Sequence, residues 1–230
     1  MTTVPSRPTT DATGAAPIAT WRTWPLLGIV VAVLGVLTLL GSTPEVPKSQ
    51  RIADPAIVLQ IAREQRLRVM AFSGAGFLVW SLLIVYTARL RQYLAARQPE
   101  HSIIPTLVWA GGLLTAAAQF TALFFTSLLV HRAVEGYPPS ALEPIQAVNE
   151  GLPFGAWTPM GLAVFAVAVA GLRDRAVPRW LGWFSAIVTA IMAVLTLTDL
   201  LAPNWFVVAV WLLVTSGTLL ARDRAAHRNP

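Results

Sequence analysis

The side chains of this sequence that could do chemistry are few, and one pair has a spacing that suits a joint task. His131 and Glu135 are four residues apart, so on a helix they would share one face. A zinc site needs three or four such ligands. The glycine and proline run 136–139 ends any helix directly after the pair. We therefore expect a solvated histidine and carboxylate at a helix end, with no metal site.

Ser73 lies among small residues, which is a setting that a membrane-embedded serine nucleophile also needs. Such a nucleophile requires a base, and none of the three histidines of the chain falls inside another apolar run. We therefore expect close helix packing here and at other small residues. The positions in question are Ala71, Gly74, Ala75, Gly76, Gly111, Gly112, Ala163, Ala166, Ala170 and Gly171.

The sequence does not have the residues that the common metal and haem cofactors require. The histidines His101, His131 and His227 are not placed to hold a haem between two spans. The chain has no cysteine, which excludes disulfides, iron–sulfur clusters, thiolate zinc sites and covalently attached haem. We expect no catalytic residue, no cofactor and no metal.

Polar side chains within the apolar runs suggest one possible ligand cavity. Thr196 and Asp199 are three residues apart, and Gln119 lies at a similar depth in another run. Thr115 is one turn below Gln119. If these faces converge, they would line a small polar cavity open to the outside. The alternative is that Asp199 caps a turn at the interface, that the threonines bond their own helix, and that Gln119 joins two helices.

Two prolines, Pro153 and Pro159, flank the outer end of the fourth apolar run. A break there would turn Glu150 and Trp157 towards the external opening. The plainer interpretation is that Pro153 starts the helix. Glu150 and His131 complete the set of candidate cavity residues.

The composition indicates which elements must position these side chains. Hydrophobic residues make up 55% of the 230 residues and charged ones 12%, whereas about a quarter are charged in soluble domains. The uncharged runs are long enough for helices that cross a bilayer and about twice as long as barrel strands. We therefore predict an all-α polytopic membrane bundle with six transmembrane helices. The spans are about 25–41, 69–88, 105–130, 153–172, 180–200 and 205–221.

The flanking segments complete the domain organisation. Residues 1–24 are rich in threonine, proline and alanine, and predict a flexible cytoplasmic tail before the membrane domain 25–221. The first span is predicted to be retained; a cleaved signal peptide is the alternative. An outer amphipathic segment is expected over about 53–68, where Asp54 and Pro55 start a helix. Residues 222–230 are expected to form a basic cytoplasmic tail.

The formal net charge of +6 is explained by topology. With both termini in the cytoplasm, eleven of the 17 lysines and arginines fall on the inner side. The excess of positive charge therefore predicts orientation in a membrane, and no nucleic acid is expected as a partner.

Three short features resemble a family of uncharacterised bacterial integral membrane proteins, domain of unknown function 4386. They are Asp54-Pro55-Ala56 leading to basic residues before the second span, the arginines from Arg89 to Arg97 after it, and Pro178-Arg179-Trp180-Leu181-Gly182 between spans four and five. The resemblance covers about residues 25–221. It implies about six helices and no established activity, so it carries over no catalytic residues.

The function predicted from the sequence is that of a non-enzymatic accessory or regulatory protein in a bacterial plasma (inner) membrane. It would act through contacts with membrane lipids, a partner membrane protein or copies of itself. The alternative is a small-solute transporter with an outward-facing polar cavity. A third hypothesis, a lipid-modifying enzyme, would require Glu135, Glu143, Glu150 and His131 to converge above the bilayer.

Overall fold

The computed structural model describes residues 23–42, 60, 63–138, 144–145, 148, 151–152, 155–198 and 204–226. Every regular element within these residues is helical. The helices are α1 (Pro25–Ser42), α4 (Arg66–Ala95), α5 (Ile104–Val134), α7 (Met160–Leu172), α8 (Arg179–Leu197) and α9 (Asn204–Ala226). The chain is therefore all-α, as predicted.

Five of these helices are long and apolar enough to cross a bilayer: α1, α4, α5, α8 and α9. This pattern is that of a multi-pass membrane protein. The helix α7 has only 13 residues and is about 20 Å long. In contrast, α4 and α5 have 30 and 31 residues and exceed the roughly 30 Å of a hydrocarbon core.

The short length of α7 follows from Pro159, which is the residue before its first turn. Proline has no backbone N–H, so the regular hydrogen-bond ladder cannot run through it. The preceding residues form tighter turns instead, in which the Thr158 N–H donates to the Gly155 carbonyl (3.0 Å) and Met160 donates to Trp157 (3.1 Å). The regular helix thus begins at Met160, later than the predicted start at residue 153, while residues 153–154 lie outside the described residues.

Local backbone geometry determines where α5 ends and where α4 begins, and these two helix ends lie together. Gly136 follows α5 with φ +82°, a conformation that favours glycine. The Tyr137 N–H then donates to the Arg132 carbonyl and closes the helix. On α4, Gln65 interrupts the helical backbone, so α4 starts at Arg66. Most of the predicted amphipathic segment 53–68 lies outside the described residues.

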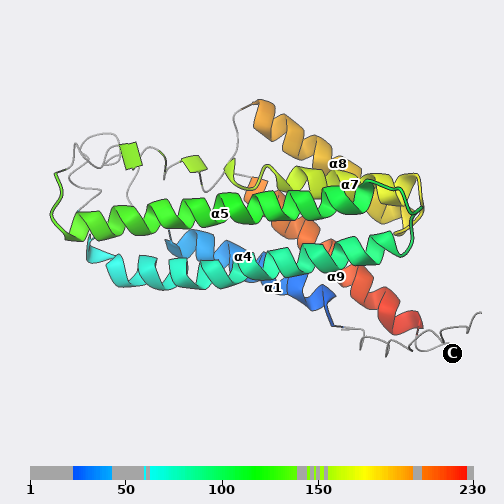
Figure 1. Cartoon of the computed structure of the whole chain (residues 1–230), viewed down its shortest axis with the longest axis horizontal. Coiled ribbons are helices and arrows are strands. Elements are labelled where there is room, and N and C mark those ends of the chain that lie inside the picture. The colour runs from blue at the N-terminus through cyan, green and yellow to red at the C-terminus, as the bar shows by residue number, and fades with distance from the viewer. Residues whose placement is uncertain are drawn as a thin grey trace, which may run out of the picture.

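The helices lie side by side (Figure 1), and their contacts close a ring. Successive neighbours are α1, α4, α5, α7, α8 and α9, and α9 packs back against α1. The contact between α8 and α9 is the smallest of the six. Large side chains from several helices fill the middle, and Trp80, Trp157 and Trp211 are almost completely buried.

Glycines bring the backbones of neighbouring helices together, as the sequence predicted for several of them. A Cβ at Gly111 of α5 would lie 2.7 Å from the backbone nitrogen of Ala163 in α7, and one at Gly171 of α7 would lie 2.7 Å from Cα of Gly182 in α8. The small residues near Ser73 behave differently. Only Gly76 packs closely, because Ala71, Gly74 and Ala75 lie on the exposed side of α4.

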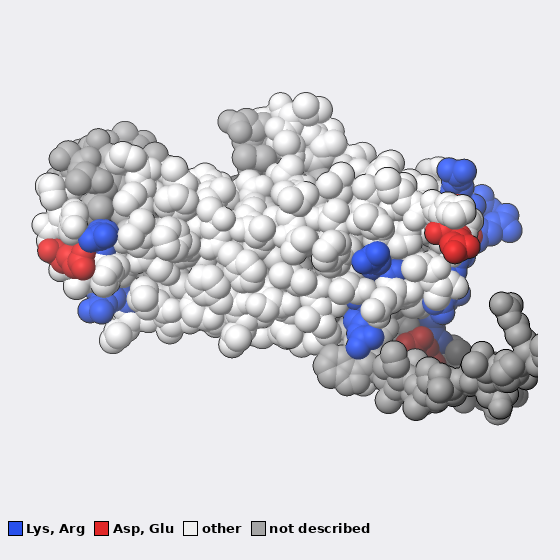
Figure 2. Space-filling view, in the orientation of Figure 1, with Lys and Arg blue, Asp and Glu red and all other residues white. Residues whose placement is uncertain are grey.

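Charged side chains gather at the two ends of the bundle, and a broad band between them carries none on the face that Figure 2 shows. One end holds the α4–α5 and α7–α8 connections, which are joined by a hydrogen bond from Gln98 Nε2 to Asp174 Oδ2 (3.1 Å). At the other end, Arg63 Nε donates to the Ala133 carbonyl near the end of α5. We call these the Arg173 end and the His131 end.

Candidate functional site

The sequence-predicted residue Gln119 lies in a buried polar cluster whose position follows from the register of α4 against α5. Gly76 faces Leu123, and Gly112 faces Thr87. These two antiparallel pairs place Trp80 opposite Gln119. The fully buried pair Val69 and Val130 obeys the same register. One long side chain from each helix therefore meets at the middle of this seam.

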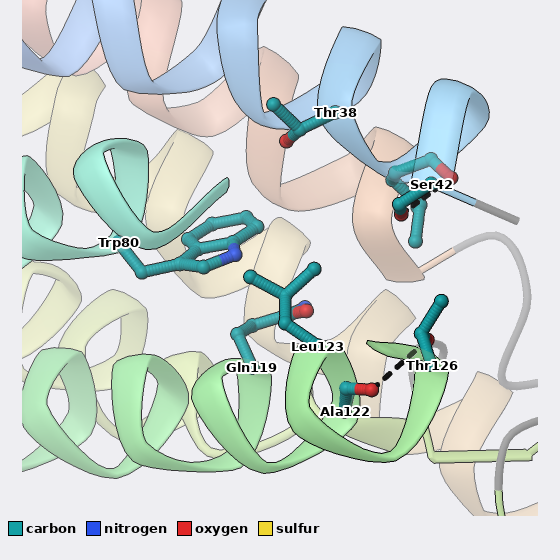
Figure 3. A pocket seen from close by; sticks show the side chains of 8 residues that line it. Thr38, Ser42, Trp80, Gln119, Ala122, Leu123 and Thr126 are labelled. Carbon is teal, nitrogen blue, oxygen red and sulfur yellow. Dashed lines mark hydrogen bonds between the residues drawn. The ribbon is translucent and has the colours of Figure 1, made fainter. Parts of the chain in front are cut away.

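We define the polar cluster as Trp80 of α4, Gln119 and Thr126 of α5, and Thr38 and Ser42 of α1 (Figure 3). All five side chains are buried. Together with Leu39, Ala122 and Leu123 they line a cavity of about 10 Å³. The cluster lies in the half of the bundle nearer the His131 end, since Ser42 ends α1 and His131 is five residues beyond Thr126.

The hydroxyl groups of the cluster donate within their own helices. Thr38 Oγ1 donates to the Gly35 carbonyl (3.0 Å), and Thr126 Oγ1 donates to the Ala122 carbonyl (3.0 Å). Ser42 Oγ donates weakly to the Leu39 carbonyl (3.4 Å). The oxygens of Thr38 and Ser42 keep lone pairs that can still accept a hydrogen bond. The α1 side of the cavity is therefore lined by acceptors.

Thr115 is completely buried one turn below Gln119, but it is not among the residues that line the cavity. Its hydroxyl donates to the Gly111 carbonyl (2.8 Å). This is the bond within the helix that the sequence analysis gave as the alternative to ligand binding.

Thr196 lies elsewhere, in a groove between α7 and α8. The two helices touch at Gly171 and Gly182, near the Arg173 end, and diverge towards the other end (Figure 1). The groove has a volume of about 760 Å³ and an almost entirely apolar lining. The lining residues are Gly155, Thr158, Pro159, Gly161, Leu162, Phe165, Thr189, Met192, Ala193, Thr196 and Leu197. Gln119 and Thr196 thus line two different spaces.

The threonine hydroxyls that line this groove on α8 already donate hydrogen bonds within their own helix. Thr189 Oγ1 donates to the Ser185 carbonyl (2.9 Å), and Thr196 Oγ1 donates to the Met192 carbonyl (2.8 Å). Phe165 and Leu197 are exposed beside them. The groove therefore suits an apolar chain and offers no charged group to a polar solute.

The remaining candidates lie at the His131 end or outside the described residues. His131 Nε2 is 3.2 Å from Glu135 Oε1, and both side chains are substantially exposed. Arg132 Nη1 also contacts Glu135, at 2.9 Å. Among the residues that the structure describes, no three histidine or acidic side chains are grouped to hold a metal ion. Glu143, Glu150 and Asp199 lie outside the described residues, so the enzyme and transporter hypotheses stay predictions.

Several residues of the two sites were missed by sequence reasoning. Thr38 and Ser42 are four residues apart, and Gln119 and Thr126 are seven apart, so each pair marks a polar stripe on one helix face. The sequence could have indicated this site, because two different apolar runs each carry a polar stripe and such stripes can face each other. Trp80 gave no signal, because tryptophan is common in apolar runs. Trp157 was considered only as a residue near the external opening, and it lines neither site. Trp157 is fully buried and meets Trp80 edge-on with ring centroids 5.1 Å apart.

Comparisons of the chain with known protein families, with curated proteins and with solved structures found no match.

Proposed function

We propose that this chain is a non-enzymatic accessory or regulatory protein of a bacterial inner membrane that acts by binding lipid in the groove between α7 and α8. The proposal includes six spans with both termini in the cytoplasm, and α7 then counts as the fourth span. The resemblance to domain of unknown function 4386 is part of the same proposal. The observation that carries it is the shape and lining of the groove.

An acyl chain is the occupant that fits the groove best. The groove narrows to the contact of Gly171 with Gly182, so its floor is closed at the Arg173 end. A straight helix that crosses the whole bilayer could not follow both walls past this contact. An acyl chain ends within its own leaflet and could enter from the open end. The hydroxyls of Thr189 and Thr196 are already bonded within α8, so an apolar chain leaves neither of them unsatisfied.

The exposure of α8 supports the same proposal. Only five of its 19 residues are buried, namely Leu181, Gly182, Ser185, Val188 and Met192. Beyond Met192 the described residues of α8 are exposed or half-buried. The C-terminal end of α8 therefore lies away from the bundle. In a membrane, lipid would cover the apolar wall that this end forms.

The orientation rests on the distribution of positive charge. The Arg173 end carries Arg173 and Arg175 on the α7–α8 connection, Arg179 at the start of α8 and Arg97 on the α4–α5 connection. The positive-inside rule assigns such an end to the cytoplasm. The groove then opens towards the outer leaflet, and a lipid of that leaflet is its proposed ligand.

The test uses a phospholipid with a photoactivatable diazirine in its acyl chain, with the full chain in bilayer nanodiscs. Crosslinked peptides are identified by mass spectrometry. We expect labelling of Leu162 and Phe165 to exceed that of the exposed α1 residues Leu34 and Leu37. Ala193→Trp should fill the groove and reduce labelling of α7 to the level of α1. Ala190→Trp is the matched control, because Ala190 is an exposed residue of α8 that does not line the groove.

Equal labelling of the groove and of α1 would refute the lipid proposal. So would groove labelling that persists unchanged in Ala193→Trp.

A further inference from the structure

We infer that the cavity between α1, α4 and α5 binds a water molecule that accepts a hydrogen bond from Trp80 Nε1. Trp80 is 1% exposed, and its indole nitrogen has no hydrogen-bond partner. An indole N–H can only donate. Figure 3 shows this nitrogen turned towards Gln119 and Leu123, which line the cavity. A ligand of the cavity must therefore accept a hydrogen bond.

The opposite wall requires the same ligand to donate. Thr38 has given its hydroxyl proton to a backbone carbonyl, and Ser42 has done so at a longer distance. Both oxygens line the cavity and can accept a hydrogen bond. A molecule that accepts once and donates twice satisfies both walls, and water has this pattern.

The volume of the cavity and the lack of charge in its lining restrict the choice of ligand further. The cavity volume of about 10 Å³ is close to the roughly 10–15 Å³ that one water molecule needs. A larger solute does not fit. The indole N–H would repel a metal cation, and no charged side chain lines the cavity to hold an anion. We therefore assign a single water.

This water would join two helices at one point. The hydroxyls of Thr38 and Ser42 donate within α1, to the Gly35 and Leu39 carbonyls. A water bonded to Trp80 and to these hydroxyls links the end of α1 to the α4–α5 seam, in which Trp80 lies. The site is independent of the proposed lipid groove, since the two share no lining residue.

Hydrogen–deuterium exchange of the tryptophan indole protons tests this assignment. The full chain, labelled with 15N at the indoles, is transferred into deuterated buffer in nanodiscs, and NMR follows each signal. Trp80 should exchange faster than Trp211, because a bound water contacts the indole N–H of Trp80, whereas the indole N–H of Trp211 is bonded to a side chain. Trp211 is the matched control: it is fully buried and its Nε1 donates to Ser185 Oγ at 2.9 Å.

Trp157 is a second control, which distinguishes the effect of a bound water from that of an indole N–H that merely has no partner. Its indole nitrogen is also buried and without a partner, but it does not line this cavity. Trp157 should therefore exchange slowly, like Trp211. Exchange of Trp80 as slow as that of both controls would overturn the inference.

Signals are assigned with single tryptophan-to-phenylalanine variants. Should Trp80→Phe fail to fold, an experimental density map gives an independent readout on the unaltered chain. We expect a peak within hydrogen-bond distance of Trp80 Nε1 in a map that also resolves waters at the bilayer interface. An empty cavity in such a map would refute the assignment.

Discussion

The contact between Gly171 and Gly182 offers a sharp test of the packing described above. A Cβ at Gly171 would lie 2.7 Å from Gly182 Cα and 3.0 Å from Gly182 N. Non-bonded carbons approach to about 3.5–4.0 Å, so Gly171→Ala must separate α7 from α8 by roughly 1 Å. Both obstructing atoms belong to the backbone and cannot rotate away. Overpacking of this kind costs about 1–3 kcal/mol.

Gly161→Ala on the same helix is the matched control. The nearest atom to a Cβ there is Met192 Cε at 3.8 Å, which is ordinary contact. Both substitutions gain about 0.5–1 kcal/mol from the better helix propensity of alanine. The difference between the two variants therefore isolates the steric cost, and we expect Gly171→Ala to be the less stable by about 1–3 kcal/mol.

The assay is reversible unfolding by SDS titrated into dodecyl maltoside micelles, followed by circular dichroism. The free energies of unfolding of the two variants are compared with that of the unaltered chain. Equal stability of the variants within about 0.5 kcal/mol would mean that α7 and α8 do not meet at these glycines. The closed floor of the groove would then be lost as an argument for an acyl chain.

Two further predictions concern a buried hydrogen bond and the topology. Ser185→Ala leaves the Trp211 indole N–H buried without its partner and should lower the free energy of unfolding by about 1–3 kcal/mol in the same SDS assay. Ser81→Ala is its control and should change stability by less than about 0.5 kcal/mol, because Ser81 is exposed and bonds only its own helix; equal effects would contradict the role of Ser185. The absence of native cysteine permits single-cysteine labelling. In intact cells an impermeant maleimide should label Lys48→Cys and Ser140→Cys but not Gln98→Cys, and the reverse pattern would invert the proposed orientation.

Much of the helical architecture could be predicted from the distribution of charge and of helix-ending residues. Uncharged runs indicated where helices form, and the glycine and proline run after Glu135 indicated where α5 ends. Gly111 and Gly171 were expected to allow close packing, and both do. These features are local, since they depend on a residue and its neighbours in the chain.

The arrangement of the sites could not be predicted in the same way. Depth along a helix follows from residue number, and the expected pairing of Gln119 with Thr196 rested on depth alone. Which helices are neighbours, and which faces they turn to each other, depends on packing of the whole ring. The α5 helix lies between α4 and α7, which directs Gln119 to Trp80 and leaves Thr196 in the groove.

The small contact between α8 and α9 gives the ring one joint that is easier to open than the others. Displacement of the C-terminal end of α8 would widen the groove while the packing of α1, α4 and α5 around Trp80 stays intact. The two sites should then be energetically uncoupled, so that the effects of Ala193→Trp and Thr126→Val on stability add in the double variant. Under the two proposals above, a ring with one small contact would respond to lipid in the groove and keep the water-binding seam between α4 and α5 unchanged.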